Sequence, residues 1–264
     1  MPRLTVKELF DLKGKRQLTE VLVTTPEEAA ACEAAGIDLI ITGLRGQTKE
    51  IREAAPNTFL TLGLRYGDCA STEEAVRAGF KALDAGGDAV YACMSTDFIA
   101  AMAREGIPVV GHVGLIPQKR TWTGGFRAVG KTADEAMRVY RHTLAHQEAG
   151  AIGVEMEVVP HQIAAEIAKR VKLLVISMGS GNGCDAQYLF GMDILGTHRN
   201  HIPRHAKVYR DFYSEFERLQ AERIAAFKEY AADVQSGTFP TADHQVEVKE
   251  EEYEKFINAL DIRF

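Results

Sequence analysis

The sequence predicts an α/β protein, a single (β/α)8 TIM barrel with extra C-terminal helices. Three observations lead to this fold class. Short apolar runs alternate with longer amphipathic segments, several of these segments stop at a glycine before the next run, and no Gly-x-Gly-x-x-Gly follows the first run. We therefore expect one barrel domain over residues 1–264, with residues 206–264 as its C-terminal helical extension.

The apolar runs are short and rich in β-branched side chains, which is typical of strands covered on both faces. A weaker eighth strand is expected around residues 190–200. In chain order the seven clear runs are Glu20–Thr24, Gly36–Gly43, Thr58–Leu64, Ala89–Cys93, Pro108–Val113, Ala151–Val158 and Lys172–Met178.

Capping residues and glycines mark the helices between these runs. A long amphipathic helix is predicted over residues 206–235, and a charged helix from Val248 to Ile257. The predicted helix starts are Thr25, Ser71, Ser95 and Thr132, and the predicted glycine stops are Gly36, Gly106 and Gly150.

Composition excludes several classes of protein. The chain has 264 residues and a net charge of −6, which argues against a protein that grips nucleic acid or an anionic membrane. No apolar run approaches the roughly 18 residues of a membrane span, and the first residues lack an apolar signal core. The four cysteines form no close metal or redox pair. We expect a cytoplasmic protein with reduced thiols.

In a (β/α)8 barrel the active site lies at the carboxyl ends of the strands. Glu155 and Glu157 are the sharpest feature there, because strand periodicity points both carboxylates to one side of an apolar run. One reading is a general base whose pKa is raised by burial, and the other is an exposed strand end or an ion pair with Arg. His112 lies at the end of another apolar run, where it is either a substrate contact or a structural residue. The other strand-end candidates are Gly43, Arg45, Gly63, Arg65, Tyr91 and Cys93.

Seven segments of the sequence, in order along the chain, together form a recognisable pattern. They are Gly111–Gln118, Gly124–Gly130, Glu157–Pro160, Met178–Asn182 with Cys184–Gln187, Met192–Gly196, His201–Lys207 and Val234–Pro240 with His244. With these segments the chain resembles the ketopantoate hydroxymethyltransferase (3-methyl-2-oxobutanoate hydroxymethyltransferase) family. The resemblance runs collinearly from about residue 20 to 245 and implies membership of the larger phosphoenolpyruvate mutase/isocitrate lyase group.

The resemblance implies aldol-type chemistry. In the family, Mg²⁺ binds a 2-oxo acid, a base removes the proton next to the ketone, and the enolate attacks a one-carbon unit from methylene-tetrahydrofolate. The family's catalytic Glu falls on Glu157, and the His of its Gly-His-x-Gly-Leu segment falls on His112. The family forms large homo-oligomers, so a homo-oligomer is expected here.

The remaining site positions depart from the family pattern. The family's metal-binding carboxylates fall on Leu44, Gly63 and Cys93, and its substrate-binding Lys falls on Tyr91. Mg²⁺ requires hard oxygen ligands, which none of these side chains offers. The resemblance therefore implies a site without the family's metal ligands, whose cofactors stay open.

Other residues are then candidates for the missing functions. Arg45 and Arg65 are candidates for an anion clamp, or for structural ion pairs. Tyr91 is a candidate proton donor, and Cys93 is either a nucleophile or a small buried residue. Glu155 forms an acid–base pair with Glu157 or replaces a lost metal ligand; the two readings stay open.

The predicted function is a divergent lyase or transferase that makes or breaks a C–C bond next to a carbonyl of a small carboxylate or 2-oxo acid. Glu157 would be the base and His112 a polarising group or proton carrier. One alternative is a true 3-methyl-2-oxobutanoate hydroxymethyltransferase, with a displaced metal on Glu155, Glu157 or Asp68. Another is a catalytically inactive binding homologue.

Overall fold

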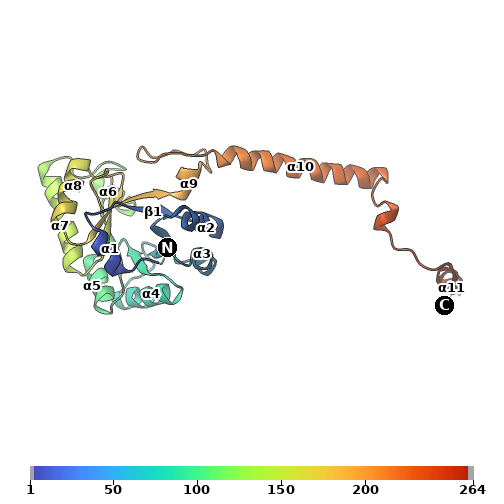
Figure 1. The fold of residues 1–264 in the computed structure, drawn as a ribbon, viewed down its shortest axis with the longest axis horizontal. Coiled ribbons are helices and arrows are strands. Elements are labelled where there is room, and N and C mark those ends of the chain that lie inside the picture. Colours follow the sequence, from blue (N-terminus) through green and yellow to red (C-terminus); the bar gives the residue numbers. More distant parts are fainter. Residues whose placement is uncertain (1–2, 261–264) are drawn as a thin grey trace. The chain divides into compact units, whose positions relative to one another are not determined.

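A closed barrel of eight parallel strands forms the body of the protein (Figure 1). The computed structural model describes residues 3–260. Each strand pairs with the next in sequence, and the last pairs with the first. The prediction of a (β/α)8 barrel is therefore confirmed. The strands are β1 (Leu18–Leu22), β2 (Leu39–Gly43), β3 (Phe59–Leu64), β4 (Ala89–Ala92), β5 (Val109–Gly114), β6 (Gly153–Glu157), β7 (Leu174–Met178) and β8 (Ala186–Phe190).

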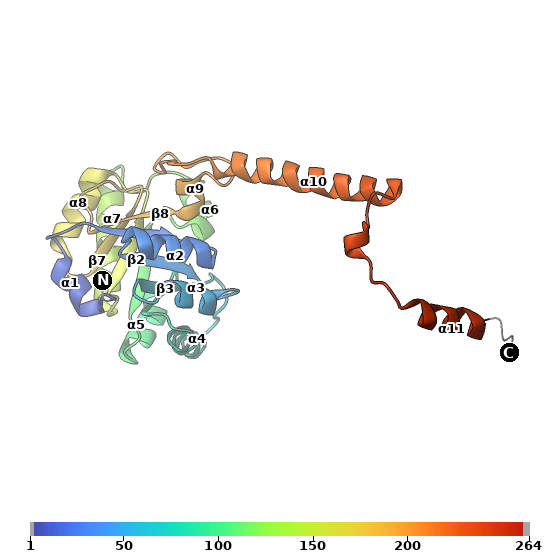
Figure 2. The same cartoon turned by 45° about the vertical axis from the view of Figure 1, so that its right-hand side comes forward.

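Helices are ranged around the outside of the strands (Figure 2). They begin where the capping residues predicted, since the side chains of Thr25, Ser71 and Thr132 each accept a hydrogen bond from a first-turn backbone N–H. The helices of this part are α1 (Val6–Leu12), α2 (Pro26–Ala35), α3 (Thr48–Ala54), α4 (Thr72–Asp84), α5 (Thr96–Arg104), η1 (Pro117–Lys119), α6 (Arg120–Thr123), α7 (Ala133–Glu148), α8 (His161–Arg170) and α9 (Gly191–Leu195).

Two apolar clusters stabilise the barrel. One lies between strands and helices and includes Ile40, Leu60 and Val154, while the other fills the lower barrel interior around Leu39 and Phe59. Burial on both faces explains why the strands are nearly continuous apolar runs.

A glycine sets the approach of α7 to β5. A Cβ on Gly111 would lie 2.1 Å from the His146 ring, so only a glycine admits that buried side chain. The close packing fixes the strand that carries His112.

Two predicted boundaries are wrong. The eighth strand covers Ala186–Phe190, and a short helix occupies Gly191–Leu195, where the strand was expected. The short β8 has only two buried residues of five, so its apolar signal is weak. The long helix α10 begins at Phe212, six residues after the predicted start at Ala206.

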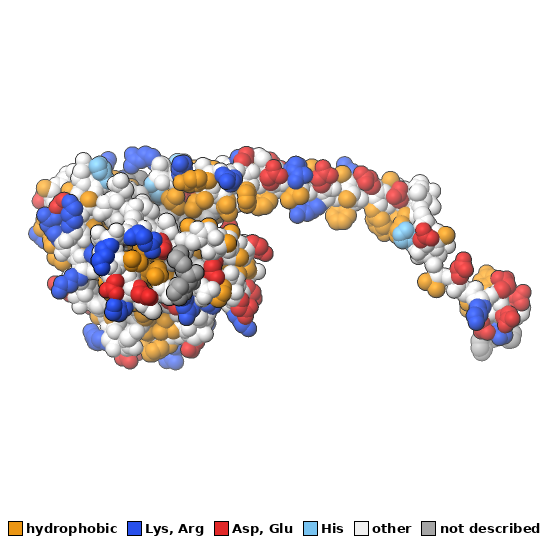
Figure 3. All heavy atoms as spheres, in the orientation of Figure 1, with side chains coloured by type: hydrophobic (Ala, Val, Ile, Leu, Met, Phe, Trp, Pro, Cys, Tyr) orange, Lys and Arg blue, Asp and Glu red, His pale blue; other side chains and the backbone are white. Residues whose placement is uncertain are grey.

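The chain divides into two compact units, residues 1–211 and 212–264. The second unit contains α10 (Phe212–Ser236), the turn η2 (Ala242–His244) and α11 (Glu250–Leu260). Apolar side chains gather along α10 (Figure 3), among them Phe216 and Phe227, which are 50% and 72% exposed. Within residues 3–260, none of the helices is long and apolar enough to span a membrane.

Candidate active site

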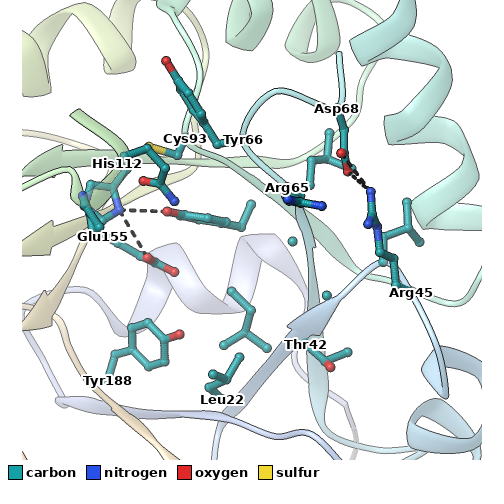
Figure 4. A pocket seen from close by; sticks show the side chains of 18 of the residues that line it. Leu22, Thr42, Arg45, Arg65, Tyr66, Asp68, Cys93, His112, Glu155 and Tyr188 are labelled. Carbon is teal, nitrogen blue, oxygen red and sulfur yellow. Dashed lines mark hydrogen bonds and ion pairs between the residues drawn. The ribbon is translucent and has the colours of Figure 1, made fainter. Parts of the chain in front are cut away.

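A cavity of about 920 Å³ opens at the carboxyl ends of the strands (Figure 4). This is the end of a (β/α)8 barrel where active sites lie. The strand-end candidates of the sequence meet in this one cavity, although they come from five strands and their loops. The predicted residues that line it are Gly43, Arg45, Gly63, Arg65, Tyr91, Cys93, His112, Glu155 and Glu157.

Side chains inside the barrel fall into layers of four, because neighbouring tilted strands contribute to alternate layers. The strand register then determines which side chains share a layer. From the cavity downward, the layers are Gly43, Cys93, Glu157 and Phe190; Leu22, Gly63, His112 and Met178; Ile41, Tyr91, Glu155 and Tyr188; and Glu20, Thr61, Val110 and Ile176.

His112 lies one layer above Glu155 and one layer below Glu157, and it contacts both. Its Nδ1 is 3.4 Å from Oε2 of Glu155, and its Nε2 is 3.3 Å from Oε2 of Glu157. All three residues are at most 9% exposed. The two carboxylates thus share one buried imidazole between them.

Hydrogen bonds fix the protonation of this imidazole. Nε2 lies 2.7 Å from the carbonyl oxygen of Leu115, which can only accept, so Nε2 carries a proton. Burial lowers the pKa of His112, but hydrogen bonds to Glu155 and Glu157 outweigh it and raise that pKa to about 10. Both ring nitrogens are therefore protonated at neutral pH.

Tyr91 is the hydrogen-bond partner of the second ring nitrogen, Nδ1 of His112. Its hydroxyl oxygen lies 2.9 Å from Nδ1 of His112 and accepts a hydrogen bond from it when His112 is a cation, which leaves the phenol's own hydrogen for Glu155 or a bound oxygen. Burial, followed by the charge of Glu155, raises the pKa of Tyr91 well above its usual value. Tyr91 is thus a neutral hydrogen-bond donor.

The backbone at the end of β6 is held in an unusual conformation. Val158, the residue after Glu157, has a φ of 49°, which is an outlier for a β-branched side chain. The carbonyl oxygen of Glu157 accepts a 2.8 Å hydrogen bond from the Leu115 amide. Backbone strain of this kind clusters at functional sites.

Gly114 faces that same carbonyl and supplies a test. A Cβ at Gly114 would lie 2.3 Å from the Glu157 oxygen, and its φ is 88°. We expect Gly114→Ala to lower the free energy of unfolding by about 1–2 kcal/mol through the left-handed backbone, and by about 1–3 kcal/mol more through the clash. Chemical denaturation measures the loss.

Gly36→Ala is the matched control, because Gly36 has a φ of 75° but nothing within 4 Å of the added Cβ. It should show only the backbone cost, of about 1–2 kcal/mol. Equal losses in the two variants would contradict the packing of Gly114 against Glu157.

The two candidate arginines differ in their surroundings. Arg45 makes an ion pair with Asp68, with both carboxylate oxygens within 2.8 Å of one nitrogen. Arg65 lines the cavity and has no ion-pair partner among residues 3–260. Arg65 is therefore the arginine free to meet an anion.

Comparison with known proteins shows to which family the chain belongs. The family model for ketopantoate hydroxymethyltransferase matches residues 43–242. The chain belongs to the ketopantoate hydroxymethyltransferase family. As expected from the resemblance, it is an enzyme of the type that acts on carbon–carbon bonds.

Relatives of the family cover nearly the whole chain. A 3-methyl-2-oxobutanoate hydroxymethyltransferase of Thermus thermophilus is 33% identical over 268 residues, which cover 92% of this chain and 99% of the relative. The corresponding protein of Deinococcus radiodurans is 34% identical over 263 residues, covering 89% and 90%.

Solved structures support the fold. A 2,3-dimethylmalate lyase, from the phosphoenolpyruvate mutase/isocitrate lyase superfamily, aligns with a TM-score of 0.54 at 13% identity, covering 97% of this chain and 99% of that chain. A phosphonopyruvate hydrolase, solved with oxalate and Mg²⁺, aligns with a TM-score of 0.52 at 12% identity, covering 99% of both.

The positions onto which the resemblance places the family's metal-binding carboxylates are Leu44, Gly63 and Cys93 in this ketopantoate hydroxymethyltransferase family member. Within residues 3–260, no group of three or more His, Cys, Asp or Glu side chains is arranged to hold a metal. Leu44 packs against the outer core cluster, Gly63 has no side chain, and Cys93 offers a buried thiol whose pKa is raised by burial. Asp68 is engaged by Arg45.

Sequence reasoning missed polar residues of the barrel interior. Tyr188 lines the cavity from β8, but the misplaced eighth strand hid its alternation. Glu20 is 2% exposed within β1. It has the same signal as Glu155, a carboxylate inside an apolar run, and this signal could have found it. His205 also lines the cavity, from the loop after α9.

Proposed function

We propose that this chain makes or breaks a C–C bond next to the carbonyl of a small 2-oxo carboxylate, without the Mg²⁺ site of its family. The chemistry would be aldol or retro-aldol, or transfer of a one-carbon unit. The observation that carries the proposal is the buried His112 cation between Glu155 and Glu157, with Tyr91 bound to it at the cavity. The names of the relatives support the substrate class.

Glu157 is the general base of this mechanism. It lines the cavity from the uppermost interior layer and is more exposed than His112 and Glu155. It removes the proton from the carbon next to the ketone, and the C–H electron pair becomes the enolate. The enolate carbon then forms a bond to the electrophilic carbon of a C=O or C=N group, whose π electron pair moves to its heteroatom and takes up a proton. The reverse sequence breaks the new C–C bond.

Tyr91 and His112 replace the metal as the electrophilic partner. The Tyr91 hydroxyl donates to the enolate oxygen while its own oxygen accepts from the His112 cation. Preorganised donors of this kind stabilise developing negative charge more than water does, because they need no reorganisation.

Arg65 binds the substrate carboxylate. A guanidinium can grip a carboxylate through two parallel hydrogen bonds, which orients the ketone toward the barrel centre. Arg45 stays with Asp68 and shapes the cavity wall.

Exchange of hydrogen for deuterium tests proton removal without any knowledge of the electrophile. We expect the enzyme to exchange the proton next to the ketone of 3-methyl-2-oxobutanoate, or of another 2-oxo acid in a panel, in heavy water. The rate should be the same with and without EDTA, since the catalytic charges belong to the chain. Proton NMR follows the loss of the C–H signal.

The outcomes separate the alternatives. Exchange that a chelator abolishes and Mg²⁺ restores would favour a displaced metal and a true 3-methyl-2-oxobutanoate hydroxymethyltransferase, which an assay with methylene-tetrahydrofolate would then confirm. Binding of 2-oxo acids with no exchange across the panel would favour a catalytically inactive homologue. Either result would overturn the proposal.

A further inference from the structure

A layer with two polar residues lies directly beneath the layer that contains Tyr91 and Glu155. Glu20 on β1 and Thr61 on β3 share this layer with Val110 and Ile176. Glu20 points into the barrel, since it has the same strand parity as Leu18 in the interior cluster. The mechanism proposed above uses neither polar residue.

Both polar residues contain an atom without a partner. Oε2 of Glu20 and Oγ1 of Thr61 are buried and have no hydrogen-bond partner among residues 3–260. Glu20 is 2% exposed and Thr61 is 1% exposed. An ionised carboxylate at this place would lose its hydration without compensation, which costs several kcal/mol by order of magnitude.

The barrel interior also holds more buried acidic groups than buried basic groups. Glu20, Glu155 and Glu157 are three buried carboxyl groups, and the buried residues within positions 3–260 include no Lys or Arg. His112 is the cation that faces them, and it contacts Glu155 and Glu157 but not Glu20. Carboxyl groups that interact in a buried site share protons, and the group with the poorer partners keeps the proton.

We propose that Glu20 is a positioning residue of this site, which holds a proton at neutral pH and so leaves the negative charge on Glu155, where it pairs with His112. The function of Glu20 within catalysis rests on the proposed function. Its protonation does not, because that follows from burial and partners alone.

The electrostatics of the barrel agree with this assignment. Burial, and then the charge of Glu155, raise the pKa of Glu20 well above its usual value. Burial, and then the charges of Glu155 and of Glu20 when it is ionised, raise the pKa of Tyr188, the register neighbour of Glu20 on β8. The titratable groups of the neighbouring layers are Tyr91 on β4, Cys93 after β4, His112 on β5, Glu155 and Glu157 on β6, and Tyr188 on β8.

Infrared difference spectroscopy tests the protonation directly. At about pH 7.5 an ordinary Glu, with a pKa of about 4.3, is ionised and lacks a carboxylic-acid C=O band. We expect the wild-type protein to show such a band and Glu20→Gln to lack it. A wild-type spectrum without the band, or a Glu20→Gln spectrum that keeps it unchanged, would overturn the proposal.

Stability against pH gives a second measurement that needs no activity. A carboxyl group with a raised pKa loses its stabilising contribution as pH rises, while Gln does not ionise. We therefore compare the folding equilibrium constant of Glu20→Gln with that of the wild type. The ratio of the variant's constant to the wild-type constant should increase with pH, by up to about tenfold per pH unit. A ratio that stays constant from about pH 5.5 to 9.5 would contradict a proton on Glu20.

Asp38→Asn is the matched control. Asp38 is a buried carboxylate held by Arg16 through two hydrogen bonds and by the Thr19 amide, and its pKa is lowered by these bonds against the opposing effect of burial. This variant should lose stability at neutral pH, whereas Glu20→Gln should not.

The two proposals can fail separately. If deuterium exchange is observed, its pH profile should shift in Glu20→Gln, since a positioning residue acts through Glu155. If exchange is absent, the infrared band still decides whether Glu20 holds a proton.

Discussion

Replacing Glu157 by Gln is expected to lower turnover, or the rate of deuterium exchange, by about 10²–10⁴-fold, the typical contribution of general base catalysis. Gln has the shape of Glu but cannot accept a proton at neutral pH. The fold should persist, because the amide still fills the uppermost interior layer beside His112. Single-turnover rates and circular dichroism measure the two parts of this prediction.

The exposed Glu148 at the end of α7 supplies the control for this experiment. Glu148→Gln removes the same charge far from the strand ends that form the cavity and should leave the rate unchanged. Near-normal activity of Glu157→Gln would refute the assignment of the base.

The second large effect concerns stability. We expect His112→Asn to lower the free energy of unfolding by about 3–5 kcal/mol at pH 8, since removing one partner leaves buried charges uncompensated. Glu155 and Glu157 lose the cation between them, and both are at most 9% exposed. The loss should diminish toward pH 5, because burial raises the pKa of Glu155 and this carboxylate then takes up a proton. Urea denaturation at several pH values gives the free energies.

The pH dependence of the wild type follows from the same cation. The pKa of His112 is raised from 6.5 to about 10 in the folded protein. A group whose pKa is higher in the folded state stabilises the fold fully at pH values below its pKa in the unfolded state. This stabilisation is lost as pH rises through its pKa in the folded state. The wild-type free energy of unfolding should therefore fall between about pH 6.5 and 10 by more than that of His112→Asn.

His161→Asn controls for the loss of a histidine, because His161 lies exposed at the start of α8. It should change stability by less than about 0.5 kcal/mol. A similarly small loss in His112→Asn would mean that the carboxylates do not depend on the buried cation.

Local sequence signals were sufficient for most of the fold. Thr25, Ser71 and Thr132 marked helix starts because a capping side chain acts within one turn. The short β8 was misplaced because its burial depends on β1 and β7, which lie far away in sequence.

The site was predicted in part. Strand-end position and the family resemblance singled out His112, Glu155 and Glu157, and the structure brings all three together. Arg45 and Arg65 were equivalent in sequence. Only the position of Asp68 distinguishes them, since it lies on a loop whose course no local pattern predicts.

The sequence by itself determined the barrel class, the strand that carries each candidate and the absence of carboxylates at Leu44, Gly63 and Cys93. Only the tertiary structure placed Glu20 beneath Glu155 and His112 between two carboxylates. The physical reason is that strand register sets which side chains share a layer. Burial and charges summed over distant strands then set which of them hold protons.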